Sequence, residues 1–432
     1  MASPQPDQTR RAAILGGNRI PFARQFGPYA QASNQDMLTA AIEGLVARYN
    51  LGGQRLGEVV AGAVIKHSRD FNLTRESVLG SSLDPHTPAY DIQQACGTGL
   101  EAAILVSNKI KLGQAESGIA GGVDTSSDAP ITVSEKLRTK LLKVNRAKGA
   151  GAQLKALGAI RPTDLGIETP ANSEPRTGLS MGEHMAQTAK RWGITREAQD
   201  ELAVASHRGL ARSYDEGFQD DLVTSFKGLA RDQNLRPDSS MEKLAKLKPA
   251  FGKGDDATMT AGNSTPLTDG ASVVLLGSEE YAAEHGLTVQ AYFVDGETAA
   301  VDYVHGEEGL LMAPAYAVPR LLARNGLTLQ DFDYYEIHEA FAATVLSTLK
   351  AWEDEDFCKD KLGLDAPLGS IDRDKLNVNG SSLAAGHPFA ATGGRIVAAL
   401  AKMLHEKGPG SRGLISICAA GGQGVVAILE GA

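Results

Sequence analysis

The sequence predicts an α/β protein with two related halves and an inserted domain. Glycines, 48 of 432 residues, cluster where an apolar run of strand length meets a helical pattern, as strand-to-helix turns require. The first and last parts of the chain show the same order of elements, although no residue-level repeat is visible. A long, charged, Pro-containing region lies between them. A chain of this length should divide into two or three domains.

The first half is predicted to comprise residues 1–126 and 262–284. We expect strands near residues 12–15 and 58–64 and a helix over residues 36–49. A further helix is predicted by apolar positions that share one face, Leu100, Ala103, Ile104 and Ile110. The segment QQACGTG therefore joins a strand to a helix.

The inserted domain is predicted over residues 127–261, and the second half over residues 285–432. This half resumes the alternation with strands at 289–294 and 332–337 and a helix at 313–326. Its last helix is predicted by the apolar positions Ile396, Ala399, Leu400, Met403 and Leu404. The chain ends in LISICAAGGQGVVAILE, two strand-length runs joined by a Gly-rich turn.

The composition excludes several classes of function. A formal net charge of −9 argues against a chain-wide affinity for nucleic acid, because that affinity needs Lys and Arg to neutralise phosphates. No run approaches the roughly 18 apolar residues of a membrane helix. The odd set of cysteines, Cys96, Cys358 and Cys418, fits free thiols in a reducing compartment, so we expect a cytoplasmic protein. We predict no metal, because no spaced Cys/His cluster occurs.

Cys96 and two histidines are the candidates for chemistry. A helix starting near Gly97 should lower the pKa of the Cys96 thiol, although an isolated Cys is more often a small core residue. His387 lies in a Gly/Ala/Ser-rich loop, where a neutral imidazole can accept the thiol proton. His338 lies between a strand and a helix, and Glu339 is expected to orient it. HEAFA is not the HExxH of a zinc site.

Four motifs in order resemble the thiolase family over nearly the whole chain. They are Cys96-Gly-Thr, HEAF from His338, NVNGSSLAAGHPFAATGGR, and Cys418-Ala-Ala. The departures from the family pattern are His338 for Asn, Ser381 for Gly, Thr98 for Ser, Ala420 for Gly, and an extra segment over residues 352–375. HEAF, CAAGGQG and this segment resemble the β-subunit branch of the fatty-acid-oxidation trifunctional enzymes.

The resemblance implies duplicated α-β-α-β-α halves with an inserted loop domain that binds coenzyme A. It implies thiolytic cleavage of a 3-ketoacyl-CoA to acyl-CoA and acetyl-CoA, or the reverse Claisen condensation. Cys96 becomes acylated, His387 activates it, His338 holds an oxygen, and Cys418 moves the substrate α-proton. The backbone N–H groups of Cys96 and Ala420 would form a second oxyanion hole.

The resemblance also implies coenzyme A as a substrate, with no cofactor bound permanently. Its contacts would be Met181, Arg236, Thr265 and Phe341, although Arg236 is equally consistent with a solvated surface side chain. A homodimer or tetramer is expected, with a possible α subunit that carries hydratase and dehydrogenase activities.

Residues 136–155 hold seven Lys or Arg and no acid, and Leu137, Leu141 and Val144 share a face. This pattern indicates a basic amphipathic helix. It is consistent with a solvated face, or with contact to CoA phosphates, a partner subunit or an anionic membrane surface.

Three alternatives remain open from the sequence. A biosynthetic acetoacetyl-CoA thiolase would carry the same motifs. A ketoacyl synthase would share the fold, but Cys418 argues against it. A non-catalytic acyl-CoA-binding subunit would not need all four reactive positions.

Overall fold

A computed structural model describes residues 10–254 and 256–432. The strands are β1 (Ala12–Arg19), β2 (Ala23–Arg24), β3 (Glu58–Ala61), β4 (Ala89–Asp91), β5 (Ser117–Asp124), β6 (Thr132–Val133), β7 (Ile167–Glu168), β8 (Pro249–Phe251), β9 (Met259–Thr260), β10 (Thr268–Ser278), β11 (Ala291–Ala300), β12 (Tyr334–Ile337), β13 (Arg412–Ala419) and β14 (Gln423–Gly431). The α-helices are α1 (Asn34–Tyr49), α2 (Leu73–Leu79), α3 (Thr98–Lys111), α4 (Glu135–Arg146), α5 (Ala150–Leu157), α6 (Met181–Arg191), α7 (Arg196–Asp215), α8 (Met241–Ala245), α9 (Glu279–Glu284), α10 (Ala313–Asn325), α11 (Ala342–Glu353), α12 (Glu355–Asp360), α13 (Ser382–Ala385) and α14 (Thr392–Lys407). Short 3₁₀ helices are η1 (Ser68–Asp70), η2 (Pro162–Asp164), η3 (Arg373–Lys375) and η4 (Phe389–Ala391).

The two halves of the chain repeat one strand topology. In the first half β1 runs antiparallel to β10, β10 antiparallel to β5, and β5 parallel to β3. In the second half β11 runs antiparallel to β14, β14 antiparallel to β13, and β13 parallel to β12. A short pairing of β1 with β11, Ala13 opposite Tyr292, joins both sets into a ten-stranded sheet. The expected similarity of the two halves is therefore a similarity of topology.

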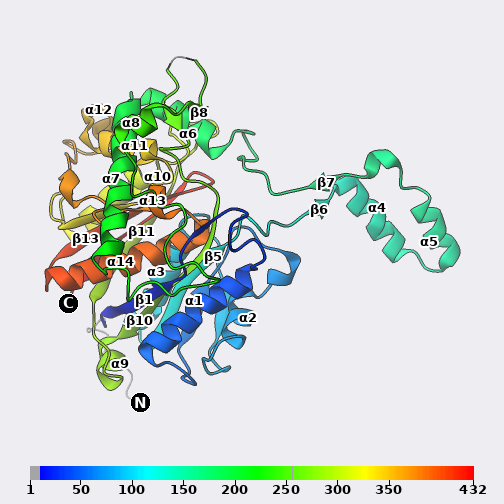
Figure 1. The fold of residues 1–432 in the computed structure, drawn as a ribbon, viewed down its shortest axis with the longest axis horizontal. Coiled ribbons are helices and arrows are strands. Elements are labelled where there is room, and N and C mark those ends of the chain that lie inside the picture. Colours follow the sequence, from blue (N-terminus) through cyan, green and yellow to red (C-terminus); the bar gives the residue numbers. More distant parts are fainter. Residues whose placement is uncertain (1–9, 255) are drawn as a thin grey trace.

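Helices α3 and α14 form the middle layer of the molecule (Figure 1). They pack against each other and against strands of both halves, while α1 covers the outer face of the first half and α10 that of the second. Glycines permit the close crossing, because a Cβ at Gly393 would lie 2.1 Å from the backbone nitrogen of Leu100. The crossing places the N-terminal ends of α3 and α14, and the turns before them, side by side.

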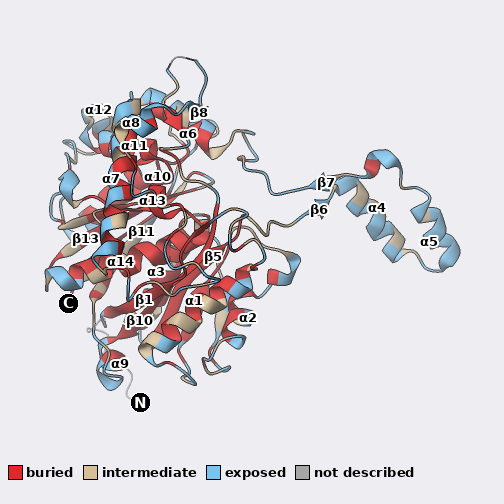
Figure 2. Ribbon diagram, viewed as in Figure 1, coloured by how far each residue is buried: buried red, intermediate tan, exposed pale blue. Residues whose placement is uncertain are grey.

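The apolar core consists of several clusters, one around α3 and α14, one under α1 and one under α10. Strands β1, β5 and β10 are buried along their full length, as Figure 2 shows, so they read as continuous apolar or Gly-rich runs rather than as alternating patterns. No helix among residues 10–254 and 256–432 is long and apolar enough to cross a membrane.

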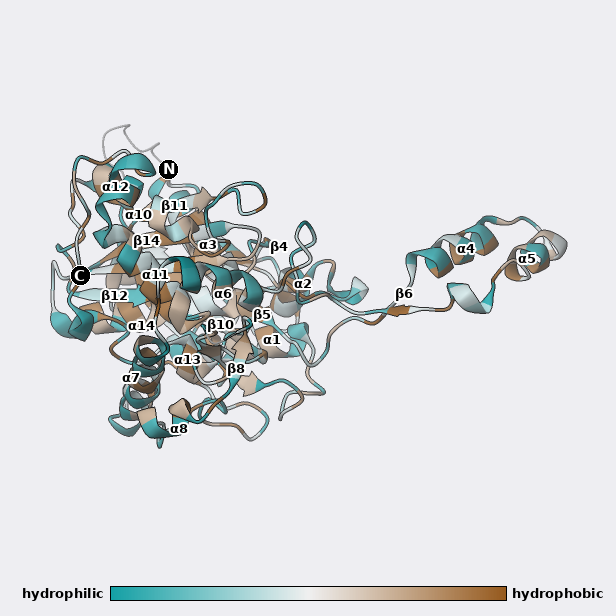
Figure 3. Ribbon diagram, turned by 90° about the horizontal axis from the view of Figure 1, so that it is seen from above, coloured by the Kyte–Doolittle hydropathy of each residue, from teal (hydrophilic) through white to brown (hydrophobic). Residues whose placement is uncertain are grey.

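An arm formed by residues 130–170 projects from the body (Figures 1 and 3). Strands β6 and β7 pair at its base, and α4 and α5 at its end contain no buried residue. The single helix predicted over residues 136–155 is wrong, because the chain leaves the helical conformation at Ala147 and Gly149 has a φ of +88°. The arm therefore ends in two short helices.

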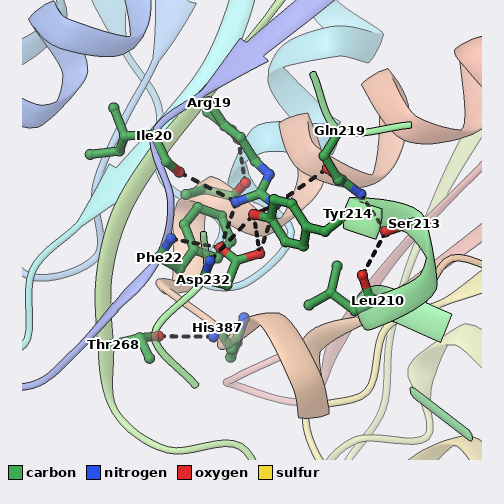
Figure 4. A network of polar contacts seen from close by, with 12 residues as sticks. Arg19, Ile20, Phe22, Leu210, Ser213, Tyr214, Gln219, Asp232, Thr268 and His387 are labelled. Atoms are coloured by element: carbon green, nitrogen blue, oxygen red, sulfur yellow. Dashed lines mark hydrogen bonds and ion pairs between the residues drawn. The ribbon is translucent and has the colours of Figure 1, made fainter. Parts of the chain in front are cut away.

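The rest of the inserted region packs on the body. Helix α7 contacts α11 and α13, and α6 contacts α11. A buried ion pair joins Arg19 at the end of β1 to Asp232, with 2.6 Å between Nη1 and Oδ1, and the Tyr214 hydroxyl donates to the same carboxylate (Figure 4). Asn234 donates to the carbonyl of Leu383, so the region is fixed directly to the segment that precedes His387.

Candidate active site

Cys96 lies in a tight turn between β4 and α3. Ala95 adopts a φ of +47°, and Gly97 is the residue before the first turn of the helix. The Thr98 hydroxyl donates to the carbonyl of Ala95 and accepts from the N–H of Gln94, which closes the turn. Thr98 therefore supplies the hydroxyl that this turn uses.

His387 approaches Cys96 from the loop before α14. Gly386 has a φ of +101°, and the N–H of His387 donates to the Thr268 hydroxyl at 2.8 Å (Figure 4). The ring Nδ1 lies 2.6 Å from the Thr392 hydroxyl, and Nε2 lies 3.0 Å from the sulfur of Cys96. An Nδ1–H donated to Thr392 leaves the lone pair of Nε2 facing the thiol. In this geometry His387 is placed to accept the thiol proton.

His338 completes a cluster of three side chains. It follows β12, is 1% exposed, and its ring centroid lies 4.1 Å from that of His387. Sulfur and ring nitrogen atoms of Cys96, His338 and His387 all lie within 4.8 Å of one another. The three atoms are also suitable ligands for a soft metal ion, which would compete with their use in proton transfer.

Glu339 does not orient His338, which corrects the prediction from the sequence. Its carboxylate accepts from Ser206, Asn377 and the N–H of Leu383. The side chain that contacts His338 is Ser382, whose hydroxyl lies 2.9 Å from Nδ1. The reason is that successive residues after a strand point in different directions, so Glu339 faces α7 and α13.

Cys418 lies at the end of β13 in an apolar cluster. It is 3% exposed, and burial raises the pKa of its thiol, with a further increase from the nearby Cys96. The apolar cluster also contains Met185, Leu310, Phe341 and Leu346, with Met181 packed against it. Cys418 is therefore a neutral thiol beside Cys96, with a proton to give.

The thiol of Cys96 is neutral at rest, which corrects the predicted low pKa. Burial raises its pKa to about 12, and the N–H of Ala420, which donates to Cys96, opposes this only in part. Charges on Asp124 and Glu174 raise it further. Cys96 keeps some accessible surface, but its sulfur lies deep among protein atoms. The partial positive charge at the start of α3 is too weak to offset the increase in pKa that this loss of hydration causes.

Burial also lowers the pKa of His387 to about 3, with a smaller contribution from the Arg395 guanidinium. Each partner alone therefore resists ionisation. A thiolate and an imidazolium formed together would stabilise each other at 3.0 Å, so proton transfer within the pair costs less than either ionisation alone. The pair is suited to transfer the proton as the sulfur attacks a carbonyl carbon.

The residues predicted to contact coenzyme A lie in two places. Met181 and Phe341 belong to the apolar cluster around Cys418, and the Thr265 hydroxyl donates to the carbonyl of Ala340 beside Phe341. Arg236 lies on the surface, where its guanidinium donates to two backbone carbonyls of its own loop. Three of the four positions thus lie in or beside the apolar cluster that contains Cys418.

The sequence interpretation missed two carboxylates that shape the site. Asp124, at the end of β5, accepts N–H groups from Ile65 and Ala390. Glu174 accepts the N–H of Gly421 at 2.8 Å and the Tyr303 hydroxyl at 2.9 Å. An acid directly after an apolar strand was a readable signal for Asp124. Glu174 gave none, because its partners are more than a hundred residues away.

Comparisons with known proteins agree with this site. The model of the thiolase N-terminal domain matches residues 12–280, and that of the thiolase C-terminal domain matches residues 287–431. The 3-ketoacyl-CoA thiolase of Pectobacterium carotovorum is 41% identical over 97% of this chain and 96% of its own, and that of Vibrio cholerae is 41% identical over 97% of both.

Solved structures give the same result. Bacillus anthracis acetyl-CoA acetyltransferase matches with a TM-score of 0.80 and 29% identity, over 99% of this chain and all of its own. Human mitochondrial 3-ketoacyl-CoA thiolase in complex with CoA matches with a TM-score of 0.79 and 26% identity, over 98% and 99% of the two chains. The resemblance to the thiolase family is confirmed, and this chain belongs to that family.

Proposed function

We propose that the protein is an acetyl-CoA C-acyltransferase that cleaves a 3-ketoacyl-CoA with coenzyme A in fatty-acid β-oxidation. The observation that carries this proposal is the contact of 3.0 Å between the Cys96 sulfur and His387 Nε2, with Cys418 beside it. A nucleophile, a base and a separate proton donor are the three groups that the reaction requires.

In the first half-reaction the Cys96 thiol gives its proton to His387 Nε2 as the sulfur attacks the 3-keto carbon. The oxygen becomes negative and then restores its double bond, which breaks the carbon–carbon bond next to it. The electron pair leaves with the acetyl-CoA enolate. Cys418 protonates this enolate carbon and becomes a thiolate, and the acyl group remains on Cys96.

In the second half-reaction the Cys418 thiolate takes the proton of an incoming coenzyme A thiol. The new thiolate attacks the acyl carbon, and the sulfur of Cys96 leaves and recovers its proton from His387. All groups then return to their resting state. The N–H of Ala420, which already points at the Cys96 sulfur, is placed to hold an oxygen attached to the same carbon.

We place the acyl and pantetheine parts of the substrate against the apolar cluster that contains Met181, Phe341 and Cys418. Thr265 lies at the edge of this cluster, and Arg236 on the surface is available for a phosphate group of coenzyme A. The free state of Cys96, Cys358 and Cys418 supports a reducing, cytoplasmic location.

The test of the mechanism separates the two cysteines. Cys418→Ala should lower thiolysis by roughly 10²–10⁴-fold, because it removes the general acid. It should also abolish exchange of the acetyl-CoA methyl protons with D₂O, followed by NMR, while mass spectrometry still detects acylated Cys96. Cys358→Ala is the matched control, because Cys358 is buried in α12 and bonds only to backbone carbonyls. Normal proton exchange in Cys418→Ala would refute the assignment.

Chain-length preference distinguishes this function from that of a biosynthetic acetoacetyl-CoA thiolase. We expect thiolysis of substrates from four to sixteen carbons, with the longer chains preferred, as in a trifunctional-type β subunit. Activity confined to the four-carbon substrate would favour the biosynthetic alternative.

We propose that the arm attaches a homodimer or tetramer to an anionic membrane surface. Helix α4 is basic, and α4 and α5 leave Leu141, Leu142, Leu154 and Leu157 exposed. Co-sedimentation with phosphatidylglycerol vesicles, but not with phosphatidylcholine vesicles, is expected. Failure to bind either vesicle, together with co-purification of a hydratase/dehydrogenase subunit lost on removal of the arm, would assign the arm to that subunit instead.

A further inference from the structure

His338 is held by a chain of buried polar side chains that the mechanism above does not use. Arg395 in α14 is 7% exposed, and its Nη2 lies 3.2 Å from the hydroxyl oxygen of Ser382. Ser382, fully buried at the start of α13, places the same oxygen 2.9 Å from His338 Nδ1. Hydrogen bonds thus connect the positive charge of Arg395, through Ser382, to His338 beside Cys96.

The chemistry of these groups fixes the direction of each hydrogen bond. A guanidinium has donors and no acceptor, so Arg395 donates and the Ser382 oxygen accepts. The Ser382 hydroxyl hydrogen is then free to point at His338 Nδ1. In the opposite arrangement, with Nδ1–H donating, two buried groups among the described residues would be unsatisfied, the Ser382 hydroxyl hydrogen and the Nε2 lone pair. With the hydroxyl donating to Nδ1, only the Nε2–H is left without a partner.

We propose that Ser382, held by Arg395, is a positioning residue that fixes His338 as the tautomer with hydrogen on Nε2. Nδ1 faces Ser382, so Nε2 is the ring nitrogen left for the cluster with Cys96 and His387, and it has no hydrogen-bond partner although it is buried. An Nε2–H there donates to the oxygen of a carbonyl that Cys96 attacks.

Burial and nearby positive charge keep the His338 ring neutral. Burial, His387 and the Arg395 guanidinium all lower the pKa of His338, and Arg395 also lowers that of His387. The groups that face Arg395 include Glu336, whose own pKa is raised to about 8 by burial, and Glu339. The two histidines thus carry their hydrogens on opposite nitrogens. His387 leaves Nε2 free as a base, and His338 offers Nε2–H as a donor.

The inference rests on the proposed thiolysis only for its kinetic consequence, because the tautomer can be read without turnover. Protein labelled with ¹⁵N-histidine would be studied by NMR, with the His338 signals assigned from their loss in His338→Asn. We expect the wild type to show Nε2 protonated and Nδ1 unprotonated. Ser382→Ala should give a mixture of tautomers and a kcat for acetoacetyl-CoA thiolysis lower by roughly ten- to a hundredfold, with KM within about twofold.

Ser381→Ala is the matched control. Ser381 also accepts from Arg395 Nη2, at 3.1 Å, and is equally buried, but its hydroxyl contacts the guanidinium rather than His338. It should leave the tautomer and kcat unchanged. Ser382→Thr, which keeps a hydroxyl, should recover part of the kcat.

An unchanged His338 tautomer in Ser382→Ala would overturn the inference, and so would an equal loss of kcat in Ser381→Ala. A wild-type protein with the expected tautomer but no thiolysis would instead refute the proposed function and leave the assignment of Ser382 standing.

Discussion

The site around Cys96 and the arm of residues 130–170 differ in how they place polar side chains. Around Cys96, charged and polar groups are buried, and some of them, such as Asp124 and Glu339, accept several hydrogen bonds. In the arm, α4 and α5 bury no residue, and their ion pairs form within the arm itself, as between Arg138 and Glu135. The pKa values of buried groups are set by the groups around them, whereas exposed groups remain available to bind a partner.

The two regions meet at Glu174. This residue follows the arm in the chain, is 5% exposed, and accepts the N–H of Gly421 in the turn that also presents Ala420 to Cys96. The arm can thus be changed without touching a catalytic group as long as Glu174 is retained.

Cys96→Ser should produce the largest loss in the centre. A serine hydroxyl is a much weaker nucleophile than a thiol, so thiolysis should fall by roughly 10⁴-fold, measured from the loss of the 3-ketoacyl-CoA absorbance. The fold should persist, because oxygen for sulfur is a small change in this turn. Covalent acylation detected at another residue, with near-normal turnover, would contradict the assigned nucleophile.

Matched ion pairs should show the difference in stability between the regions. Arg19 and Asp232 are almost fully buried, so Asp232→Asn leaves a buried guanidinium without its counter-charge and should cost about 3–5 kcal/mol of unfolding free energy. Glu135→Gln breaks the exposed pair with Arg138 and should not change the midpoint of thermal unfolding measurably. Equal shifts of the unfolding midpoint, followed by circular dichroism, would show that burial does not determine how much each ion pair contributes to stability.

The activity at acid pH tests whether burial lowers the pKa of His387. With its pKa lowered to about 3, the ring stays neutral, and able to accept a proton, as pH falls from 7 to 5.5. The value of kcat/KM should then change by less than about twofold, whereas a base with the ordinary pKa of about 6.5 would lose roughly tenfold. Circular dichroism at each pH would control for unfolding. An acid limb near pH 6.5 would contradict this description of the site.

The sequence predicted the order of strands and helices because periodicity and Gly-rich turns are local signals. The family motifs also predicted Cys96, His338, His387 and Cys418 as one group, and the structure brings them together although they are far apart in the sequence. The raised pKa of Cys96 depends on burial by distant segments, which no local pattern records. The role of Ser382 depends on how α13 lies against β12, so the adjacent acid Glu339 was the wrong choice. The break at Gly149, in contrast, was visible in KGAG.

Removal of the arm should have the smallest effect on the body. Thr132 and Glu168 are opposite partners in the β6–β7 pair, so a two-residue Gly turn can replace residues 133–167 without moving the ends. We expect kcat for acetoacetyl-CoA to stay within about twofold, since α4 and α5 bury nothing. Binding to phosphatidylglycerol vesicles should be lost at the same time. A large fall in kcat would mean that the arm acts on the centre through Glu174, and the two regions would then form one functional unit.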